Sequence, residues 1–389
     1  MKTSVAIVGA GPAGSLLSLI LHRAGIDNVV VERQTRAYVL ERVRAGVLEA
    51  GTMDTLRRHG VGDRMDREGH IHETVNIGWR GEEMLSINTQ ERVDRQMMAY
   101  GQTAIQEDLY AALDANGTPP IFEAVDLELH DVATERPSVT FIKDGVVERI
   151  DCDYVAGCDG FHGVSRQTIP DGVRTEYEKE YPFGWLGILS ETPPLPILLY
   201  ANHERGFGLC SMRTPTLSRY YVQCPLTDSV DDWSDDRFWD ELLARMPSAQ
   251  RSQIVTGPSV EKSIAPLRSY VAEPMSYGAL FLAGDAAHIV PPTGAKGLNL
   301  AVSDVHYLSE AFIQRYQRGS MIGLDGYSDR ALRRVWAAVR FSWWLTKLLH
   351  RFPDDTPFDV RAQEQELSHL ATFPLAQAAM AEQYVGLPY

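Results

Sequence analysis

The sequence predicts an α/β fold to which an antiparallel-sheet domain and a helical C-terminal segment are added. Three observations lead to this prediction. The first thirty residues read as strand, turn, helix and strand; residues 183–224 read as successive strands without helices between them; and from Ala279 the strand-to-helix pattern returns. Such an order is typical of a parallel sheet combined with a second, antiparallel layer.

A β-α-β unit opens the chain. The apolar run Val5–Val8 predicts a buried strand, and the glycines of Gly9–Gly14 predict a tight turn. Apolar residues then recur at helical spacing up to Ala24, and Gly25 ends the helix. The valine-rich segment Asn28–Glu32 predicts a second strand, in a parallel sheet that is covered on both faces.

The middle and the end of the chain have different patterns. Four segments predict the strands of an antiparallel sheet: Phe183–Leu189, Ile197–Asn202, Gly206–Met212 and Arg219–Cys224. A strand at Leu280–Ala283, a loop rich in glycine and proline and a helix from about Leu298 then follow. Residues 331–349 predict a long helix, whose aromatic side chains we assign to the core or to a dimer contact.

Composition limits the class of protein. The net charge of −15 over 389 residues argues against a nucleic-acid partner, because phosphate binding needs a positive surface. The four cysteines show no C-x-x-C spacing, so we expect no metal site, no redox dithiol and reduced thiols in the cytoplasm. No apolar run reaches the roughly 18 residues of a membrane span, so no membrane segment is expected.

The segment Gly9-Ala10-Gly11-Pro12-Ala13-Gly14 fits the pattern G-x-G-x-x-G. It lies between a predicted strand and a predicted helix, whose N-terminus favours phosphate groups. Glu32 ends the next strand, where a ribose hydroxyl needs an acceptor. The sequence therefore predicts dinucleotide binding, although the pattern by itself does not separate FAD from NAD.

A second loop has related chemistry. Gly284-Asp285 ends a predicted strand, and Pro291–Gly297 leads into a helix. The carboxylate then lies at the edge of the sheet where ligands bind, and the helix start can stabilise negative charge. An elongated cofactor held at both ends is one interpretation; a plain strand-to-helix loop with a capping aspartate is the other.

The chain resembles the single-component flavoprotein aromatic hydroxylases. The Gly9–Gly14 segment, Cys158-Asp159-Gly160 and Gly284-Asp285 are the three signatures of that family, in its order. Further matches are spread almost from end to end: Arg42–Glu49, Tyr100–Thr103, Ala156–Gly163, Tyr200–His203, Ser218–Gln223, Lys262–Arg268, Gly284–Asn299 and Tyr384–Tyr389.

The resemblance implies a domain organisation. Residues 1–71, 101–180 and 268–349 would form a glutathione-reductase-like FAD-binding domain. Residues 72–100 and 181–267 would form a substrate-binding sheet domain, and residues 350–389 would form a C-terminal helical segment. A homodimer is the habit of the family.

The activity implied by the resemblance is hydroxylation of 4-hydroxybenzoate to 3,4-dihydroxybenzoate with NADPH and O₂, through a flavin C4a-hydroperoxide. Three alternatives stay open: a hydroxylase of a related aromatic acid, a halogenase, and a flavin-binding redox sensor without catalysis. The halogenase pattern W-x-W-x-I-P is missing, because Trp185-Leu186-Gly187-Ile188 lacks the second tryptophan.

The resemblance also implies the FAD contacts, several of which lie in the two glycine-rich loops. They are Gly9, Gly11, Pro12, Ala13, Gly14, Glu32, Arg42, Arg44, Gln102, Asp159, Asp285, Leu298 and Asn299. An arginine such as Arg44 suits this role, since a guanidinium pairs with phosphate through two hydrogen bonds.

For the substrate, the resemblance implies that Ser211, Arg213 and Tyr221 hold the carboxylate. Tyr200 and Tyr384 would lead a proton from the substrate phenol toward His72, and the carbonyl of Pro292 would lie near the phenol. A free phenol has a pKa of about 10 and is mostly protonated at pH 7, so a proton path would help it to react as phenolate.

No second G-x-G-x-x-G segment is present for the nicotinamide donor. The family binds NADPH in a surface cleft, and the matching positions are Arg33, Gln34, Tyr38, Arg42, His162, Arg166 and Arg268. Arginines near a 2′-phosphate favour NADPH over NADH.

Overall fold

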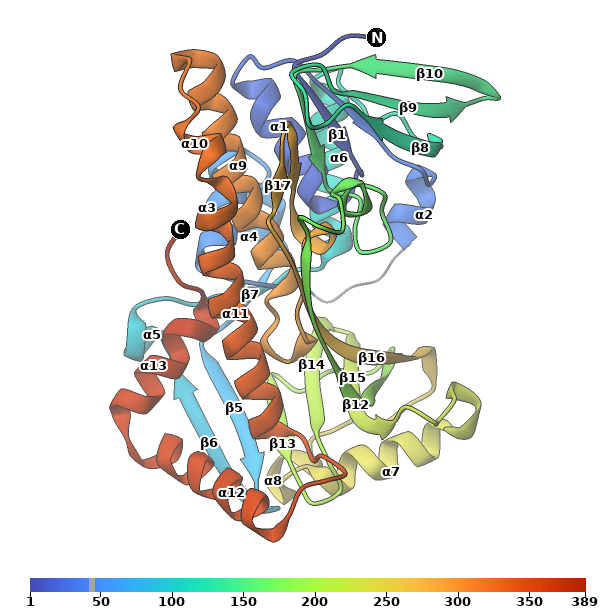
Figure 1. Cartoon of the computed structure of the whole chain (residues 1–389). Helices are drawn as coiled ribbons and strands as arrows, with labels where there is room; N and C mark the ends of the chain where they lie inside the picture. Colours follow the sequence, from blue (N-terminus) through green and yellow to red (C-terminus); the bar gives the residue numbers. More distant parts are fainter. Residues whose placement is uncertain (42–45) are drawn as a thin grey trace.

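The computed structural model describes residues 1–41 and 46–389 of the chain. It has an upper body around a five-stranded sheet and a lower body around an eight-stranded sheet (Figure 1). The α/β fold with an added, mostly antiparallel sheet and a helical C-terminal part is confirmed.

The five-stranded sheet has the order β17-β18-β11-β1-β2. Its strands are β17 (Ser276–Tyr277), β18 (Leu280–Leu282), β11 (Tyr154–Gly157), β1 (Val5–Val8) and β2 (Asn28–Val31). β1 pairs in parallel with β2 and β11, and β11 pairs in parallel with β18. The predicted parallel sheet is therefore present, and β17 adds an antiparallel edge.

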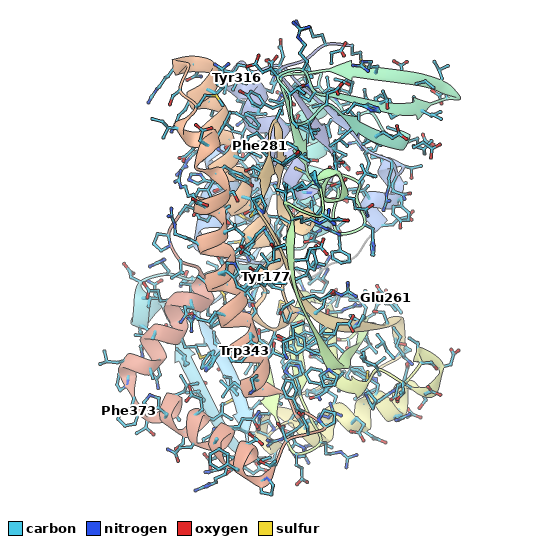
Figure 2. The ribbon with its side chains drawn as sticks, in the orientation of Figure 1. Tyr177, Glu261, Phe281, Tyr316, Trp343 and Phe373 are labelled. Carbon is cyan, nitrogen blue, oxygen red and sulfur yellow. The ribbon has the colours of Figure 1, made fainter. Side chains whose placement is uncertain are left out.

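Helices cover this sheet. α1 (Pro12–Arg23) packs against α6 (Gln102–Ala115) and α9 (Gly297–Arg318). Proline suits the first position of α1, because that position needs no hydrogen-bonded N–H. Phe281 of β18 lies in the middle of the upper body in Figure 2, with its ring edge-on to Phe312 and Tyr327. These contacts join the sheet to α9 and α11 (Tyr327–Leu349).

The eight-stranded sheet has the order β19-β16-β12-β15-β14-β13-β5-β6. The bounds are β19 (His288–Ile289), β16 (Ser259–Glu273), β12 (Thr175–Ser190), β15 (Leu217–Pro225), β14 (Gly208–Thr214), β13 (Leu199–Asn202), β5 (Thr74–Trp79) and β6 (Glu83–Asn88). Neighbours are antiparallel except β13 and β5, which run in parallel.

The strands β12 and β16 run from the upper body into the lower one in Figure 1. The predicted strand Phe183–Leu189 is only the second half of β12. The first half, Thr175–Glu180, consists mainly of exposed charged residues and pairs with residues 268–273. Its lack of apolar residues explains why the sequence did not predict it.

The other elements surround these sheets. Two small sheets have the orders β10-β9-β8 and β3-β7-β4. Their strands are β8 (Val125–His130), β9 (Ser138–Lys143), β10 (Val146–Asp151), β3 (Val47–Leu48), β4 (His70–His72) and β7 (Met97–Ala99). The remaining helices are α2 (Arg36–Glu41), α3 (Ala50–Arg58), α4 (Asp63–Glu68), α5 (Thr89–Val93), α7 (Asp235–Arg245), α8 (Ser248–Arg251), α10 (Ile322–Asp325), α12 (Pro357–Thr372) and α13 (Pro374–Val385). Short 3₁₀ turns occupy Arg166–Thr168, Val230–Asp232, Gly284–Ala286 and Pro292–Gly294.

Within residues 1–41 and 46–389, no helix combines the length and the apolar character that a membrane crossing requires. The same residues hold no cluster of three or more histidine, cysteine, aspartate or glutamate side chains arranged to bind a metal ion.

The turn between β1 and α1 generates a stability prediction. A Cβ atom on Gly14 would lie 1.9 Å from the carbonyl oxygen of Gly9, whereas a Cβ atom on Gly11 would meet nothing within 4 Å. We expect Gly14→Ala to lower the free energy of unfolding by about 1–3 kcal/mol, because α1 must move away from β1. Gly11→Ala is the matched control and should unfold close to wild type in urea. Equal unfolding midpoints for the two variants would show that the close approach of α1 to β1 does not depend on Gly14.

Candidate active site

A large cavity of about 520 Å³ receives residues from both bodies. The upper body contributes the turn before α1, the end of β2, the start of α6 and the start of α9. The lower body contributes Trp185, Arg219 and Tyr221. Of the predicted FAD contacts, Gly11, Pro12, Ala13, Glu32, Gln102, Asp159, Asp285 and Leu298 line this cavity.

The three glycines of the first turn have different surroundings. Gly9 has a φ of +101°, and a Cβ atom there would lie 2.4 Å from the carbonyl oxygen of Cys158. Gly9 and Gly14 therefore let the chain segments approach each other, and Gly11 alone faces open space. This division fits a backbone that must come close to a phosphate at the start of a helix.

Glu32 is held in place at the end of β2. Its two carboxylate oxygens accept the backbone N–H groups of Ala10 and Gln34, each at 2.9 Å. The carboxylate lines the cavity and keeps lone pairs for a further donor. The geometry fits a ribose hydroxyl as that donor.

Asp159 presents an acceptor without a partner. One oxygen accepts the backbone N–H of Ser165 at 2.9 Å and its hydroxyl at 3.0 Å. The other oxygen, Oδ1, is buried and has no hydrogen bond within the described part of the chain. Burial raises the pKa of Asp159. A buried acceptor at a cavity wall fits a ligand that supplies a donor.

The start of α9 forms the opposite wall. Gly297 and Leu298 line the cavity, so the first N–H groups of the helix are directed to the ligand side. The side chain of Asn299 has another task. Its oxygen accepts from the backbone N–H of Glu49 and the hydroxyl of Thr52, and its amide donates to the carbonyls of Val47 and Ala295. Only the backbone of Asn299 is left for a cofactor.

Arg42 and Arg44, two more predicted FAD contacts, lie outside the described residues. The polar groups that are described, namely a glycine turn, two placed carboxylates and a helix start, fit an elongated anionic nucleotide. Asp285 also lines this cavity, from the 3₁₀ turn Gly284–Ala286 that follows β18.

A smaller cavity of about 40 Å³ adjoins the large one and shares Val47 and Arg219 with it. His72, Ser211 and Arg213 line it, so the structure brings these three predicted substrate residues together. Burial lowers the pKa of the Arg213 guanidinium. A carboxylate ligand would offset that loss of solvation.

Arg219 connects the predicted carboxylate residues. Its backbone carbonyl accepts the Ser211 hydroxyl at 2.7 Å, and its Nε donates to the Tyr221 hydroxyl oxygen at 3.0 Å. The proton of the Tyr221 hydroxyl is thus free to be donated elsewhere. The other end of the guanidinium pairs with Glu261 at 3.1 Å, a residue that Figure 2 shows at the upper edge of the lower body.

Tyr200 and Tyr384 form a buried hydrogen-bonded pair. Tyr200 also donates to the carbonyl of Thr293 at 3.2 Å, so Tyr384 is the donor within the pair. Burial raises the pKa of Tyr200 to about 12. The carbonyl of Pro292, the predicted partner near the phenol, accepts the N–H of Ala295 at 2.9 Å, while Pro292 itself lines the large cavity.

His72 lies in the smaller cavity and not beside the tyrosine pair. Within the described ranges no hydrogen bond joins it directly to Tyr384. Burial, with a smaller contribution from His70, lowers the pKa of His72 to about 4. His72 is therefore neutral at pH 7 and can act as a proton acceptor. Its pKa is lower than the near-neutral value expected from the sequence.

The residues predicted for NADPH lie in two places. The Phe161 ring is close to the His162 ring, at 5.1 Å, and to the guanidinium groups of Arg166 and Arg268, at 4.6 and 5.0 Å. Arg166 is almost buried and donates to the carbonyls of Phe161 and Ala286. Arg33 and Gln34 follow β2, and Tyr38 lies in α2.

Sequence reasoning did not assign several residues of the cavity wall. Lys296 is buried there and donates to Glu49 at 2.6 Å and to the carbonyl of Tyr384 at 2.9 Å. The indole N–H of Trp185 donates to His350 at 2.7 Å. The charge of Lys296 within Pro291–Gly297 was a usable signal, whereas Trp185 gave none.

Comparison with known proteins places the chain in a family. The family described as "FAD binding domain" matches residues 2–342. The p-hydroxybenzoate hydroxylase of Acinetobacter baylyi is 51% identical, over 100% of this chain and 96% of that protein. The rifampicin monooxygenase of Streptomyces venezuelae is 26% identical, over 78% of this chain and 62% of that protein.

Solved structures agree on the fold. The p-nitrophenol 4-monooxygenase of Pseudomonas putida has a TM-score of 0.81 at 17% identity, with 100% of both chains covered. An aklavinone-11 hydroxylase, solved with FAD and aklavinone, has a TM-score of 0.74 at 21% identity, over 90% of this chain and 69% of that one. With its cavity built for an elongated nucleotide, the chain therefore belongs to the FAD-binding family of aromatic hydroxylases.

Proposed function

We propose that this protein hydroxylates 4-hydroxybenzoate to 3,4-dihydroxybenzoate with FAD, NADPH and O₂. The observation that carries the proposal is the smaller cavity, where Arg213 and the neighbouring Tyr221 offer an anion site next to the large cavity. Ser211 lines the same cavity, with its hydroxyl donating to the carbonyl of Arg219. The relative from Acinetobacter baylyi, named p-hydroxybenzoate hydroxylase, supports the choice of substrate.

The chain would hold FAD along the large cavity, with Gly9–Gly14 and Glu32 at the nucleotide end and Leu298 and the backbone of Asn299 at the ring end. Asp159, Asp285 and Gln102 line the same cavity and would contact the cofactor between these two ends. Bound FAD would supply the redox chemistry, taking electrons from NADPH and activating O₂. The protein would supply binding, orientation and the exclusion of water.

The substrate carboxylate would be held by the guanidinium of Arg213 and by the free proton of Tyr221. This leaves the phenol directed toward Pro292 and Tyr200. Tyr200 can accept the phenol proton only if it passes its own proton on. For that step its hydroxyl would turn from the carbonyl of Thr293 to Tyr384, which reverses the hydrogen bond between the two tyrosines. His72 would receive the proton through water, since no direct hydrogen bond reaches it within the described chain.

Two alternatives differ in what they predict for purified protein. A hydroxylase of a related aromatic acid would turn over another compound faster, and a redox sensor would bind FAD without substrate-stimulated NADPH oxidation. The test is to follow NADPH and O₂ consumption with a panel of hydroxybenzoates and to identify the product. Formation of 3,4-dihydroxybenzoate only from 4-hydroxybenzoate is expected; a colourless protein unable to take up FAD would end the proposal.

We also propose a homodimer located in the cytoplasm. Trp336 and Trp343 lie one heptad apart on α11 and are partly exposed, and the Trp336 ring is edge-on to Tyr177. Such an apolar face suits a second copy of the chain. The four cysteines are free thiols, which suits a reducing compartment. Sedimentation of the protein at several concentrations tests the dimer.

The first prediction from the proposed function concerns the proton path. Tyr200→Phe removes the hydroxyl that joins the carbonyl of Thr293 to Tyr384. We expect the affinity for 4-hydroxybenzoate to stay within about threefold and hydroxylation to slow by roughly 10²-fold, the scale of general acid–base effects. Tyr181→Phe, which removes a buried hydroxyl bonded to Ser269, is the control. Unchanged turnover of the Tyr200 variant would reject its role.

The second prediction concerns the carboxylate. Arg213→Ala should weaken binding of 4-hydroxybenzoate by about 2–4 kcal/mol, because a desolvated charge pair is lost. Binding of 4-methylphenol, which lacks the carboxylate, should change little, and the exposed Arg205→Ala should affect neither ligand. Equal losses for both ligands would show a general distortion and not an anion site.

The third prediction concerns the donor. Arg268 is partly exposed and contacts Glu178 and Glu180 only at 3.6 Å, so it can turn to a phosphate. Arg268→Ala should raise the KM for NADPH roughly tenfold, as expected for the loss of a charged hydrogen bond. The dissociation constant of 4-hydroxybenzoate should not change. Wild-type kinetics for NADPH would remove Arg268 from the donor site.

A further inference from the structure

The last residues of the chain are gripped by cations from distant segments. Lys296 donates to the carbonyl of Tyr384, and Arg95 donates to the carbonyl of Gly386 at 2.9 Å. Arg334, on α11, donates to the carbonyls of Leu387 and Pro388. Three cationic side chains thus hold one carbonyl in the last turn of α13 and three carbonyls beyond its end.

This arrangement supplies a hydrogen-bond partner for the C-terminal end of α13. The final carbonyls of an α-helix lack partners within the helix, and cations near them are favourable. Within the described chain, the carbonyl of Tyr384 has its partner in Lys296 and not in a following backbone N–H. The position of the last turn of α13 therefore depends on side chains outside that helix.

Glu49 couples two of the cations. Its oxygens pair with Lys296 at 2.6 Å and with Arg334 at 2.8 Å, and all three side chains are buried or nearly so. A Cβ atom on Gly386, which has a φ of +97°, would lie 2.2 Å from the Glu49 carboxylate. Residues 384–389, the C-terminal tail, therefore lie directly against the ion cluster of Glu49, Lys296 and Arg334. Only glycine fits at position 386.

The same residues reach the final tyrosine. The Arg334 guanidinium lies 4.7 Å from the centre of the Tyr389 ring, whose other neighbours include the His306 ring at 4.9 Å. Arg334 thus contacts the tail at two carbonyls and at one ring, and it contacts Glu49 as well. No other described side chain makes this combination of contacts with residues 384–389.

We propose that Arg334 is a positioning residue: with Glu49 it clasps residues 384–389 and so holds the Tyr384 hydroxyl in hydrogen-bond contact with Tyr200. The inference rests on the proposed function, in which that contact passes a proton. Proton transfer needs heavy atoms within about 2.6–3.2 Å, so a small displacement of the last turn of α13 breaks the path.

The test compares variants at two positions of one helix. Arg334→Met removes the clasp but leaves Glu49 paired with Lys296, so no buried anion is orphaned. Arg334→Lys keeps a charge that can reach only part of the contacts. Arg330→Met is the matched control, because Arg330 lies one turn earlier, is partly exposed and pairs with Glu310 at 3.0 Å without touching the tail.

Two readouts separate a positioning role from a structural one. Hydrogen exchange followed by mass spectrometry reports the tail in the FAD-loaded protein without turnover. For Arg334→Met we expect the amides of Tyr384 and Val385, in the last turn of α13, to exchange about tenfold faster than in wild type. The second readout is dihydroxybenzoate formed per NADPH consumed, together with the KM and kcat for 4-hydroxybenzoate. We expect a lower product yield and kcat with an unchanged KM, and partial rescue by Arg334→Lys.

Each outcome decides the matter. Exchange in Arg334→Met equal to that in Arg330→Met would overturn the clasp. Faster exchange with a wild-type product yield would overturn the positioning role. If wild type itself forms no dihydroxybenzoate, the proposed function fails, while the exchange measurement still decides whether Arg334 holds the tail.

Discussion

The arrangement of the site depends on the ion pairs made by the buried carboxylate of Glu49. A charge inside a protein needs partners, and breaking such a pair is strongly destabilising. Glu49 precedes α3 and finds its partners in Lys296, at the start of α9, and Arg334, on α11. Its backbone N–H donates to the side-chain oxygen of Asn299, whose amide in turn donates to the carbonyl of Val47 in β3. Segments far apart in sequence therefore meet at one point beside the large cavity, with the helix start that would face a cofactor fixed among them.

The second constraint is the pairing of β12 with β16. These strands extend from the upper body into the lower one as a paired ladder, so the two bodies cannot move independently without bending or breaking it. Within the ladder the register shifts between Glu180 and Gly184, at the level where the bodies meet. Trp185 follows directly and enters the cavity wall, with its indole N–H bonded to His350. The irregularity thus lies where a side chain from the sheet joins the site, as is usual for bulges near functional sites.

The sequence predicted those parts of the site that depend on local geometry. A turn needing Gly9 and Gly14 and a carboxylate at the end of the next strand follow from spacing alone, and the structure has both at the cavity. Long-range packing escaped prediction. Nothing near Arg219 in the sequence indicates that its guanidinium reaches both Tyr221 and Glu261. The strands β5 and β6 join the lower sheet across a long stretch of chain, and only the resemblance had grouped residues 72–100 with that sheet. The resemblance identified Tyr200, Tyr384 and His72 as candidate site residues. The pKa of His72, however, depends on its burial, which cannot be read from any single segment of the sequence.

Cationic side chains line the two cavities, although the molecule as a whole is acidic. The chain carries a net charge of −15, yet Arg213, Arg219 and Lys296 line the two adjoining cavities. Solvent screens the acidic exterior, whereas buried cations act across a short distance in a medium of low polarity. Burial lowers the pKa of both Arg213 and Lys296, so each gains from an anion placed nearby. In the proposed function the substrate carboxylate would be that anion for Arg213, whereas Lys296 already has one in Glu49 at 2.6 Å. Burial raises the pKa of Tyr200 to about 12, so the site favours a neutral tyrosine over a tyrosinate. The tyrosine pair would therefore relay a proton only by releasing one as it receives another.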